Sequence, residues 1–127
     1  MGRVAYVDTS CLAAIVFGER EAASMVRRLA RADELVAANL LEAELRAVAV
    51  REQVPWDSSA VARIAWVSPD RPLHSEIERV LAAGYVRGAD CWHLAVALFL
   101  APDPGDLDFV TLDDRQRAVA AALGFHT

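Results

Sequence analysis

Short apolar segments alternate with longer segments of helical spacing along this 127-residue chain. The short segments have the apolar character of buried strands and are bounded by polar or turn-forming residues. Strands are predicted at residues 3–7, 34–38 and 108–112, with further candidates at 65–67 and 124–126. The pattern therefore indicates a small sheet whose strands are separated by helices.

The segments between the strands place apolar residues three and four positions apart, which is the spacing of a helix that buries one face. Helices are predicted to begin at 8–10 and to span 22–32, 39–52, 57–66, 73–86, 90–101 and 113–123. Asn39 is the expected N-cap of its helix, since its side chain can accept a backbone hydrogen bond. Strands alternating with helices predict a parallel sheet covered on both faces. We expect an α/β fold and a single domain over residues 1–127.

Composition supports a chain that folds unaided, with 55% hydrophobic and 24% charged residues. No apolar run approaches the roughly 20 residues needed to span a bilayer, and the first strand pattern begins too early for a signal peptide. We therefore expect a cytoplasmic protein without a membrane segment. Cys11 and Cys91 have no metal-binding or redox spacing, so we expect buried free thiols.

The net charge is −5, and all 13 basic residues are arginine. Arginine makes bidentate contacts with phosphate, so a local basic rim is compatible with an acidic whole. Codon usage in a G+C-rich genome is an alternative explanation of the same bias. The absence of lysine excludes Schiff-base chemistry and P-loop nucleotide binding, because both need a lysine amine.

Two aspartates directly follow predicted strands. Asp8 comes after the apolar run 4–7, and Asp113 comes after 109–111. In parallel α/β sheets, ligands bind beyond the carboxyl ends of the strands, where the strand order reverses. We favour Asp113 over its neighbour Asp114 because it is nearer to the strand, where Thr111 can orient it or a bound water. One of the two also caps the last helix.

Helical geometry separates two glutamates of the segment 39–52. Glu44 falls between Leu40 and Val48, inside the apolar arc, where an acid is costly unless it is paired or bound to a cation. Glu42 falls outside the arc, one turn before Arg46, and an i,i+4 ion pair explains it. Glu44 is therefore the candidate ligand.

Asp90 is expected to open the apolar helix 90–101, where its ordinary role is an N-cap. His93 lies three residues on, on the same face. By itself, such a histidine is more often a buried core residue whose hydrogen bonds are satisfied. The two together favour a functional site, because an N-cap aspartate can also offer its outer oxygen to a metal.

A cluster of such carboxylates would repel itself, since one pair 4 Å apart costs about 4 kcal/mol at an effective dielectric constant near 20. It persists by binding a divalent cation or by taking up protons. Oxygen ligands favour Mg²⁺ or Mn²⁺ over zinc. The ion would polarise a phosphate oxygen and activate water, which indicates phosphodiester hydrolysis.

Four motifs carry a resemblance to a known family: Tyr6–Ser10, Ala43–Arg46, Gly88–Ala95 and Val110–Asp113. In this order and spacing they resemble the PIN domain family, and most of all the small stand-alone ribonuclease toxins of the VapC type. The resemblance covers essentially the whole chain. It implies a three-layer α/β/α sandwich with a short, mostly parallel sheet.

The resemblance also implies a Mg²⁺- or Mn²⁺-dependent endoribonuclease that inhibits translation. A cognate antitoxin would insert a C-terminal segment into the active-site groove, and homodimers are usual. By motif position, the catalytic and metal-ligand roles fall on Asp8, Glu44, Asp90 and Asp113. Supporting roles fall on Thr9, Ser10 and Thr111, with His93 beside them. The arginines that flank the acids are the candidate RNA contacts: Arg87, Arg115 and Arg117.

As a hypothesis, an ion held by Asp8, Asp90 and Glu44 activates water for in-line attack, leaving a 3′-hydroxyl and a 5′-phosphate. Asp113 would bind a second ion or orient the water. Two rivals remain. A receiver domain or an aspartate-based phosphatase also places an aspartate after its first strand, but it normally needs a lysine in the site. The second rival is a PIN-like binding module whose acids no longer turn over substrate.

Overall fold

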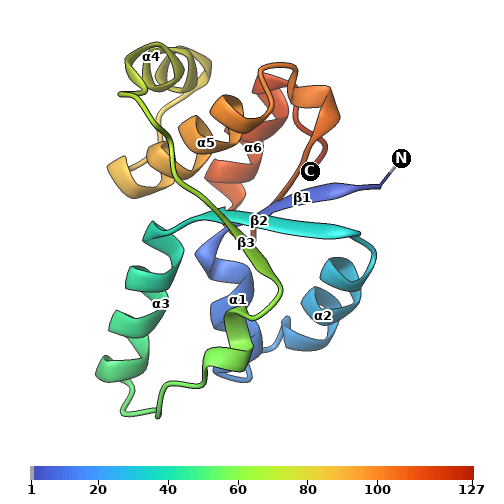
Figure 1. Cartoon of the computed structure of the whole chain (residues 1–127), viewed down its shortest axis with the longest axis vertical. Helices are drawn as coiled ribbons and strands as arrows, with labels where there is room; N and C mark the ends of the chain where they lie inside the picture. The colour runs from blue at the N-terminus through green and yellow to red at the C-terminus, as the bar shows by residue number, and fades with distance from the viewer. Residues whose placement is uncertain (1) are drawn as a thin grey trace.

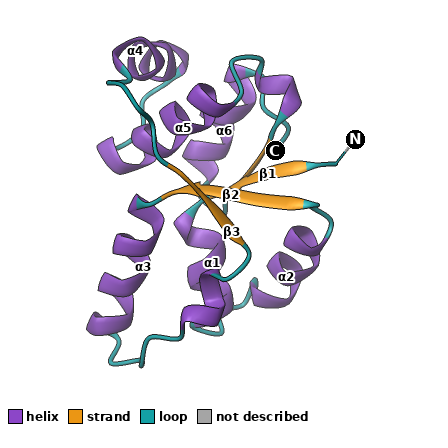
Figure 2. Ribbon diagram, in the orientation of Figure 1, coloured by secondary structure: helices purple, strands orange, loops and turns teal. Residues whose placement is uncertain are grey.

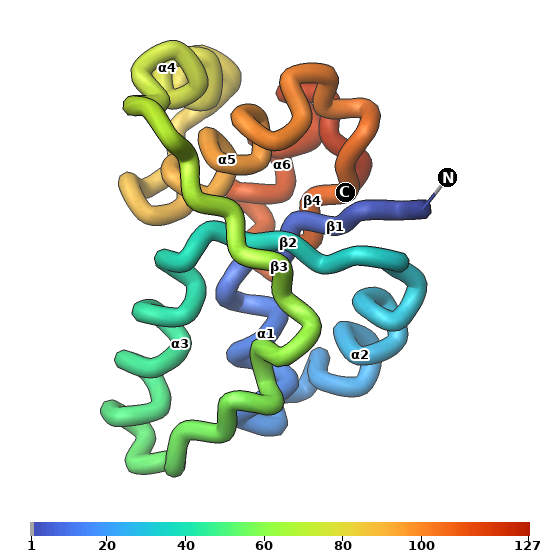
Figure 3. Tube along the Cα trace, in the orientation of Figure 1, coloured from blue at the N-terminus to red at the C-terminus, as the bar shows by residue number. Residues whose placement is uncertain are grey.

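The computed structural model describes residues 2–127 and contains a four-stranded sheet in which every pair of neighbours is parallel. The strand order is β3-β2-β1-β4, and Figure 3 shows β4 beside β1. The strands are β1 (Val4–Val7), β2 (Glu34–Ala38), β3 (Ile64–Val67) and β4 (Asp108–Val110). The sheet is short, as the sequence predicts.

Helices cover both faces of this sheet (Figures 1 and 2). The helices of one face are α1 (Thr9–Val16), α2 (Ala22–Ala30) and α3 (Leu40–Arg51). Those of the other face are α4 (His74–Ala83), α5 (Gly88–Leu100) and α6 (Asp114–Leu123). Two 3₁₀ turns, η1 (Ser58–Val61) and η2 (Pro104–Asp106), precede β3 and β4. The predicted α/β/α sandwich is confirmed.

Alternation along β1 divides the interior into two cores. Tyr6 packs with α4, α5 and α6, whereas Ala5 and Val7 pack with α1, α2 and α3. Successive residues of a strand point to opposite faces, so an apolar strand supplies both layers at once. Each fully buried aliphatic side chain contributes about 1.5–3 kcal/mol. The same alternation directs the Tyr6 hydroxyl toward the α5 side of the sheet.

The strand order reverses between β1 and β4. The chain runs outward from β1 to β2 and β3, and then crosses to the other side of β1 to form β4. Val7 is paired with Val110, and the Asp8 amide donates to the Val110 carbonyl at 3.0 Å. The carboxyl ends of β1 and its neighbour β4 therefore stand side by side, which is where ligands bind in such sheets.

The predicted helix at 57–66 is wrong, and the alternative strand at 65–67 is confirmed. The chain makes only the turn η1 there, and residues 64–67 then pair with β2. Ala65 and Trp66 are exposed on this outer strand. Pairing with a distant segment decides the structure here, and local spacing carries no information about that pairing.

Three other expectations change at element ends. The helix predicted from Asp90 begins at Gly88, so Arg87 is its N-cap and Asp90 lies in its first turn. Asn39 is at the N-cap of α3, but its side chain makes no capping hydrogen bond. The candidate strand at 124–126 is reduced to a single bridge between Asp108 and His126. In the part of the chain that the structure describes, no helix combines the length and apolarity needed to cross a bilayer.

Candidate active site

Asp8 directly follows β1, and its carboxylate is buried with one oxygen held by hydrogen bonds. Its Oδ2 accepts hydrogen bonds from the Ser10 hydroxyl at 2.7 Å and the Ser10 amide at 3.2 Å, and it lies 3.2 Å from the Thr111 hydroxyl. The amide contact makes Asp8 the N-cap of α1. No residue of 2–127 donates to Oδ1. Capping and a site role therefore coexist, with one oxygen for each.

The end of β4 is tied to Asp8 through hydroxyl groups. Ser10 Oγ accepts from the Leu112 amide at 3.0 Å, and Thr111 Oγ1 accepts from the Asp113 amide at 3.0 Å. Asp113 is the N-cap of α6 and accepts from the Gln116 amide at 2.7 Å through Oδ1. The hydroxyls of Ser10 and Thr111 thus hold the ends of β1 and β4 in a fixed arrangement.

Between the two candidate acids at this point, the structure separates Asp113 from Asp114. The Asp114 side chain is 95% exposed and pairs with Arg117 at 2.7 Å. Asp113 instead folds back against the first turn of its own helix, beside Thr111. The placement agrees with the choice of Asp113 as the acid at the strand end.

Glu44 enters the site from α3. Its Oε1 accepts hydrogen bonds from the Thr9 hydroxyl at 2.8 Å and from His93 Nε2 at 2.7 Å. Burial opposes its ionisation, but the hydrogen bonds from His93 and Thr9 outweigh that effect and hold the pKa of Glu44 below its ordinary value. Glu42 pairs with Arg46 at 3.0 Å on the outer surface, as helical geometry predicts.

His93 is fully buried and bridges Glu44 to the centre of the sheet. Its Nδ1 lies 2.7 Å from the hydroxyl oxygen of Tyr6, which also accepts the Ala38 amide at 3.1 Å. Burial raises the pKa of Tyr6 far above its ordinary value, so the phenol keeps its proton. The buried histidine is therefore hydrogen-bonded at both ring nitrogens.

The charges that act on Asp90 include those of the other three predicted acids. Burial raises the pKa of Asp90 first, and the charges of Asp8, Asp113 and Glu44 raise it further. The Gln116 side chain also donates to the Asp90 carbonyl at 3.4 Å, which joins the first turns of α5 and α6. The four predicted acids therefore share an electrostatic environment at the carboxyl ends of the strands.

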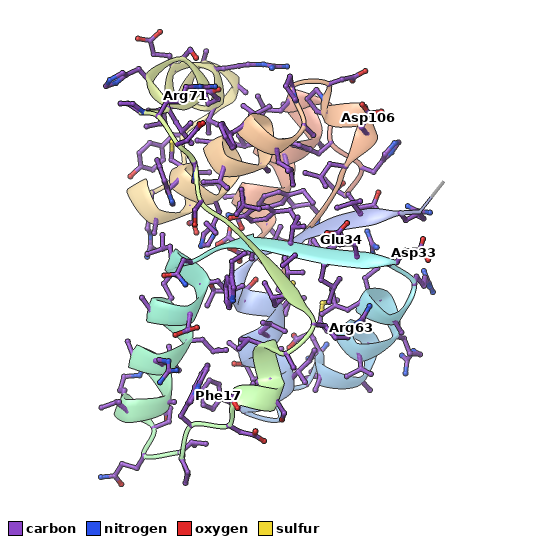
Figure 4. The ribbon with its side chains drawn as sticks, viewed as in Figure 1. Phe17, Asp33, Glu34, Arg63, Arg71 and Asp106 are labelled. Atoms are coloured by element: carbon purple, nitrogen blue, oxygen red, sulfur yellow. The ribbon has the colours of Figure 1, made fainter. Side chains whose placement is uncertain are left out.

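A buried acid at the opposite end of the sheet, Asp108, has arginine partners, unlike the site aspartates. Asp108 pairs with Arg3 at 2.7 Å and Arg28 at 3.6 Å, and Asp33 accepts from the Arg3 amide at 2.6 Å. Figure 4 shows Asp33 and Glu34 at the amino end of β2. Over residues 2–127, no salt bridge is formed by Asp8, Asp90 or Asp113. The site aspartates therefore lack the arginine partners that the buried Asp108 has.

The chemistry of this donor set fits a hard divalent cation. All four acids offer carboxylate oxygens, and an ion would supply the positive charge that the Asp90 environment lacks. Within residues 2–127, no three histidine, cysteine, aspartate or glutamate side chains stand close enough to hold one ion as they are placed. The cluster is therefore suited to an ion by composition and charge, and side-chain rotation would have to complete the ligand set.

The candidate RNA contacts differ in how firmly they are held. Arg87 and Arg115 are exposed, and the Arg115 guanidinium lies 5.7 Å from the Tyr85 ring centre. Arg117 donates to the Thr111 carbonyl at 2.8 Å as well as to Asp114. Arg117 therefore stabilises the β4–α6 connection. Arg87 and Arg115 are exposed at the surface, where a ligand can reach them.

Both cysteines are buried free thiols, as predicted. Burial, with a further contribution from the charge of Asp8, raises the pKa of Cys11 to about 12, and burial raises that of Cys91. Burial thus disfavours the thiolate form of both residues, which argues against a cysteine nucleophile at this site.

Two buried polar residues of the site escape the sequence interpretation. Gln116 lies 2.7 Å from Thr111 through Oε1 and reaches Asp90 through Nε2. Its signal is present in the sequence, because it shares the apolar face of its helix with Val119 and Ala120. Tyr6 gives a weaker signal, a hydroxyl inside an apolar strand, which must find a partner when it is buried.

A family model described as PIN domain matches residues 5–122. This range includes β2, β3, β4, most of β1 and all four acids. No curated protein and no solved structure matches the chain.

Proposed function

The chain belongs to the PIN domain family, whose members are in general divalent-metal-dependent nucleases, and on this premise we propose that it is a metal-dependent endoribonuclease. We further propose that it acts as the toxin of a toxin–antitoxin pair, hydrolysing RNA phosphodiesters and thereby inhibiting translation. One observation carries the nuclease assignment: Asp8, Asp90 and Asp113, which form no salt bridge within residues 2–127, share an electrostatic environment at the carboxyl ends of β1 and β4, and each belongs to a different element.

The residues divide the chemistry among them. Asp8, Glu44 and Asp90 would hold a Mg²⁺ or Mn²⁺ ion, and Asp113 would hold a second ion or orient the attacking water. A bound ion supplies a Lewis acid for a phosphate oxygen and a lowered pKa for a coordinated water. Ser10 and Thr111 keep Asp8 in place, and Thr9 does so for Glu44. In-line attack at phosphorus would leave a 3′-hydroxyl and a 5′-phosphate.

The test is cleavage of RNA by the purified chain. Total cellular RNA and a panel of single-stranded oligonucleotides are incubated with Mn²⁺, with Mg²⁺ or with EDTA, and new 5′-phosphate ends are mapped. We expect cleavage in both metals and none in EDTA. If calorimetry shows that Mn²⁺ binds and no RNA is cut, the assignment is wrong and a PIN-like binding module is favoured.

The two exposed arginines beside the acids support RNA as the ligand, and their replacement is a second prediction. Arg87→Ala and Arg115→Ala should each weaken RNA binding. Each should also make the negative slope of log affinity against log salt concentration shallower by about 0.7, the value for one phosphate contact with a single strand. Fluorescence anisotropy of a labelled oligonucleotide measures both. Arg51→Ala is the control, because Arg51 is exposed at the end of α3 and pairs with Glu52. Equal slopes in all three variants would contradict the assignment.

An antitoxin and a second copy of the chain are the proposed protein partners. An apolar cleft of about 380 Å³ beside the start of α5 supports a protein contact, since it is bordered by the exposed side chains of Leu81 and Tyr85. Expression of the chain alone should arrest growth, and co-expression of the product of a neighbouring gene should relieve the arrest. Arrest that no such product relieves would count against the toxin–antitoxin role.

A further inference from the structure

A continuous chain of hydrogen bonds runs from the end of β2 to the acid cluster. The Ala38 amide donates to the Tyr6 hydroxyl oxygen at 3.1 Å, that oxygen lies 2.7 Å from His93 Nδ1, and His93 Nε2 lies 2.7 Å from Glu44 Oε1. Tyr6 and His93 are both fully buried, so no solvent competes for these contacts. Four elements, β2, β1, α5 and α3, contribute one residue each.

The donor and acceptor of each hydrogen bond in this series can be assigned from the position of its proton. A backbone amide only donates, so the Tyr6 oxygen accepts from Ala38. The phenol proton then needs an acceptor of its own, and His93 Nδ1 is the atom in place to accept it. With Nδ1 as an acceptor, the ring carries its proton on Nε2 and donates it to the Glu44 carboxylate. Every buried donor is thereby matched to one acceptor.

This series of hydrogen bonds ends on one oxygen of Glu44 and does not involve the other. Thr9 donates to the same Oε1 at 2.8 Å, so two donors from different elements grip a single atom. Within residues 2–127, Oε2 accepts no hydrogen bond. A carboxylate held in this way cannot turn about its last bond without losing both charge-assisted hydrogen bonds.

We propose that Tyr6 and His93 are positioning residues, which orient the Glu44 carboxylate so that Oε2 is presented to the divalent ion. The inference rests on the proposed nuclease function for the identity of that ion. Partners that orient a ligand in this way typically change metal affinity or activity by about 10–100-fold when they are lost. A histidine that only filled the core would stabilise the fold without changing metal affinity.

Metal affinity separates the two roles. His93→Leu should lower the Mn²⁺ affinity measured by calorimetry by about 10–100-fold, and Tyr6→Phe should lower it by a smaller factor. His93→Gln should restore most of it, because the glutamine amide offers one donor and one acceptor with similar separation. Val96→Ala, a fully buried change on the same helix, should lower stability and leave Mn²⁺ affinity unchanged. Wild-type affinity in His93→Leu, or equal losses in the leucine and glutamine variants, would overturn the proposal.

A spectroscopic measurement needs neither metal nor a variant that folds poorly. The ¹⁵N spectrum of the metal-free wild-type protein should show His93 protonated at Nε2 and unprotonated at Nδ1. Tyr6→Phe should keep this tautomer, because the Glu44 carboxylate still requires a donor at Nε2, and should shift the Nδ1 signal, because that nitrogen loses its hydrogen bond. A proton on Nδ1 of the wild type would overturn the proposed direction. If the wild type binds Mn²⁺ with the expected dependence on His93 but cuts no RNA, the nuclease assignment fails and the positioning role stands.

Discussion

Asp8→Asn protein should cleave RNA more slowly than the wild type by a factor on the order of 10³ or more, since an active-site metal supplies several kcal/mol of transition-state stabilisation. The loss is expected because the amide cannot supply the negative oxygen that holds the ion. The fold should survive, because asparagine is as good an N-cap as aspartate and can still accept from the Ser10 amide. Cleavage rates on one defined oligonucleotide, together with circular dichroism, measure both effects.

The acids of the β4–α6 connection provide a matched pair for this experiment. Asp113→Asn should lose activity as Asp8→Asn does, whereas Asp114→Asn should keep it, although both remove one charge at adjacent positions. The Asp114 side chain is 95% exposed and pairs with Arg117, whereas the Asp113 amide donates to the Thr111 hydroxyl that also contacts Asp8. Cleavage at the wild-type rate by Asp8→Asn would reject the proposed site, and equal losses in Asp113→Asn and Asp114→Asn would reject the assignment of the fourth acid.

The positions of several residues follow from local geometry and could be predicted from the sequence. The separation of Glu44 from Glu42 needed only the period of one helix, and the structure places Glu44 at His93 and Glu42 at Arg46. The positions of Asp8 and Asp113 followed from the ends of two strands, because the ends of parallel strands meet at one edge. Their roles in catalysis remain predictions.

Features that depend on distant partners could not be predicted. The outer strand β3 exists because residues 64–67 pair with β2, and an edge strand with two exposed residues has no clear pattern of its own. The start of α5 was misplaced because helix ends depend on which carbonyl begins the ladder, and here the Cys91 amide donates to the Arg87 carbonyl. The contact between Tyr6 and His93 joins residues 87 positions apart, and no local pattern encodes it.

Mn²⁺ should raise the stability of the wild-type protein strongly at neutral pH. A ligand at 1,000 times its dissociation constant adds about 4 kcal/mol to the free energy of unfolding, which corresponds to a rise in Tm on the order of 10 °C for a chain of this size. EDTA should reverse the rise. Asp90→Asn should show a much smaller rise, because it removes one of the proposed ligands. Differential scanning calorimetry with and without Mn²⁺ measures these shifts.

In the metal-free protein, Asp90→Asn should have the opposite effect and stabilise the fold. The pKa of Asp90 is raised in the folded state by burial and by the charges of Asp8, Asp113 and Glu44. An unfolded aspartate loses its proton at a pH of about 3.9, so the folded state holds the extra proton above that pH. The Asp90 contribution to stability therefore falls as pH rises from about 4 through the raised folded pKa, and is constant above it.

Glu44 acts in the other direction, because its folded pKa is lowered and its contribution is lost as pH falls through that value. Glu44 is present in both the wild type and Asp90→Asn, so its pH-dependent contribution cancels when the free energies of unfolding of the two proteins are subtracted. That difference should be small below a pH of about 4, grow as pH rises, and shrink with added salt, since Asp90 is only partly buried. A wild-type protein that Mn²⁺ leaves unchanged, or an Asp90→Asn variant that is less stable without metal at neutral pH, would show that these acids do not form a mutually repelling metal site.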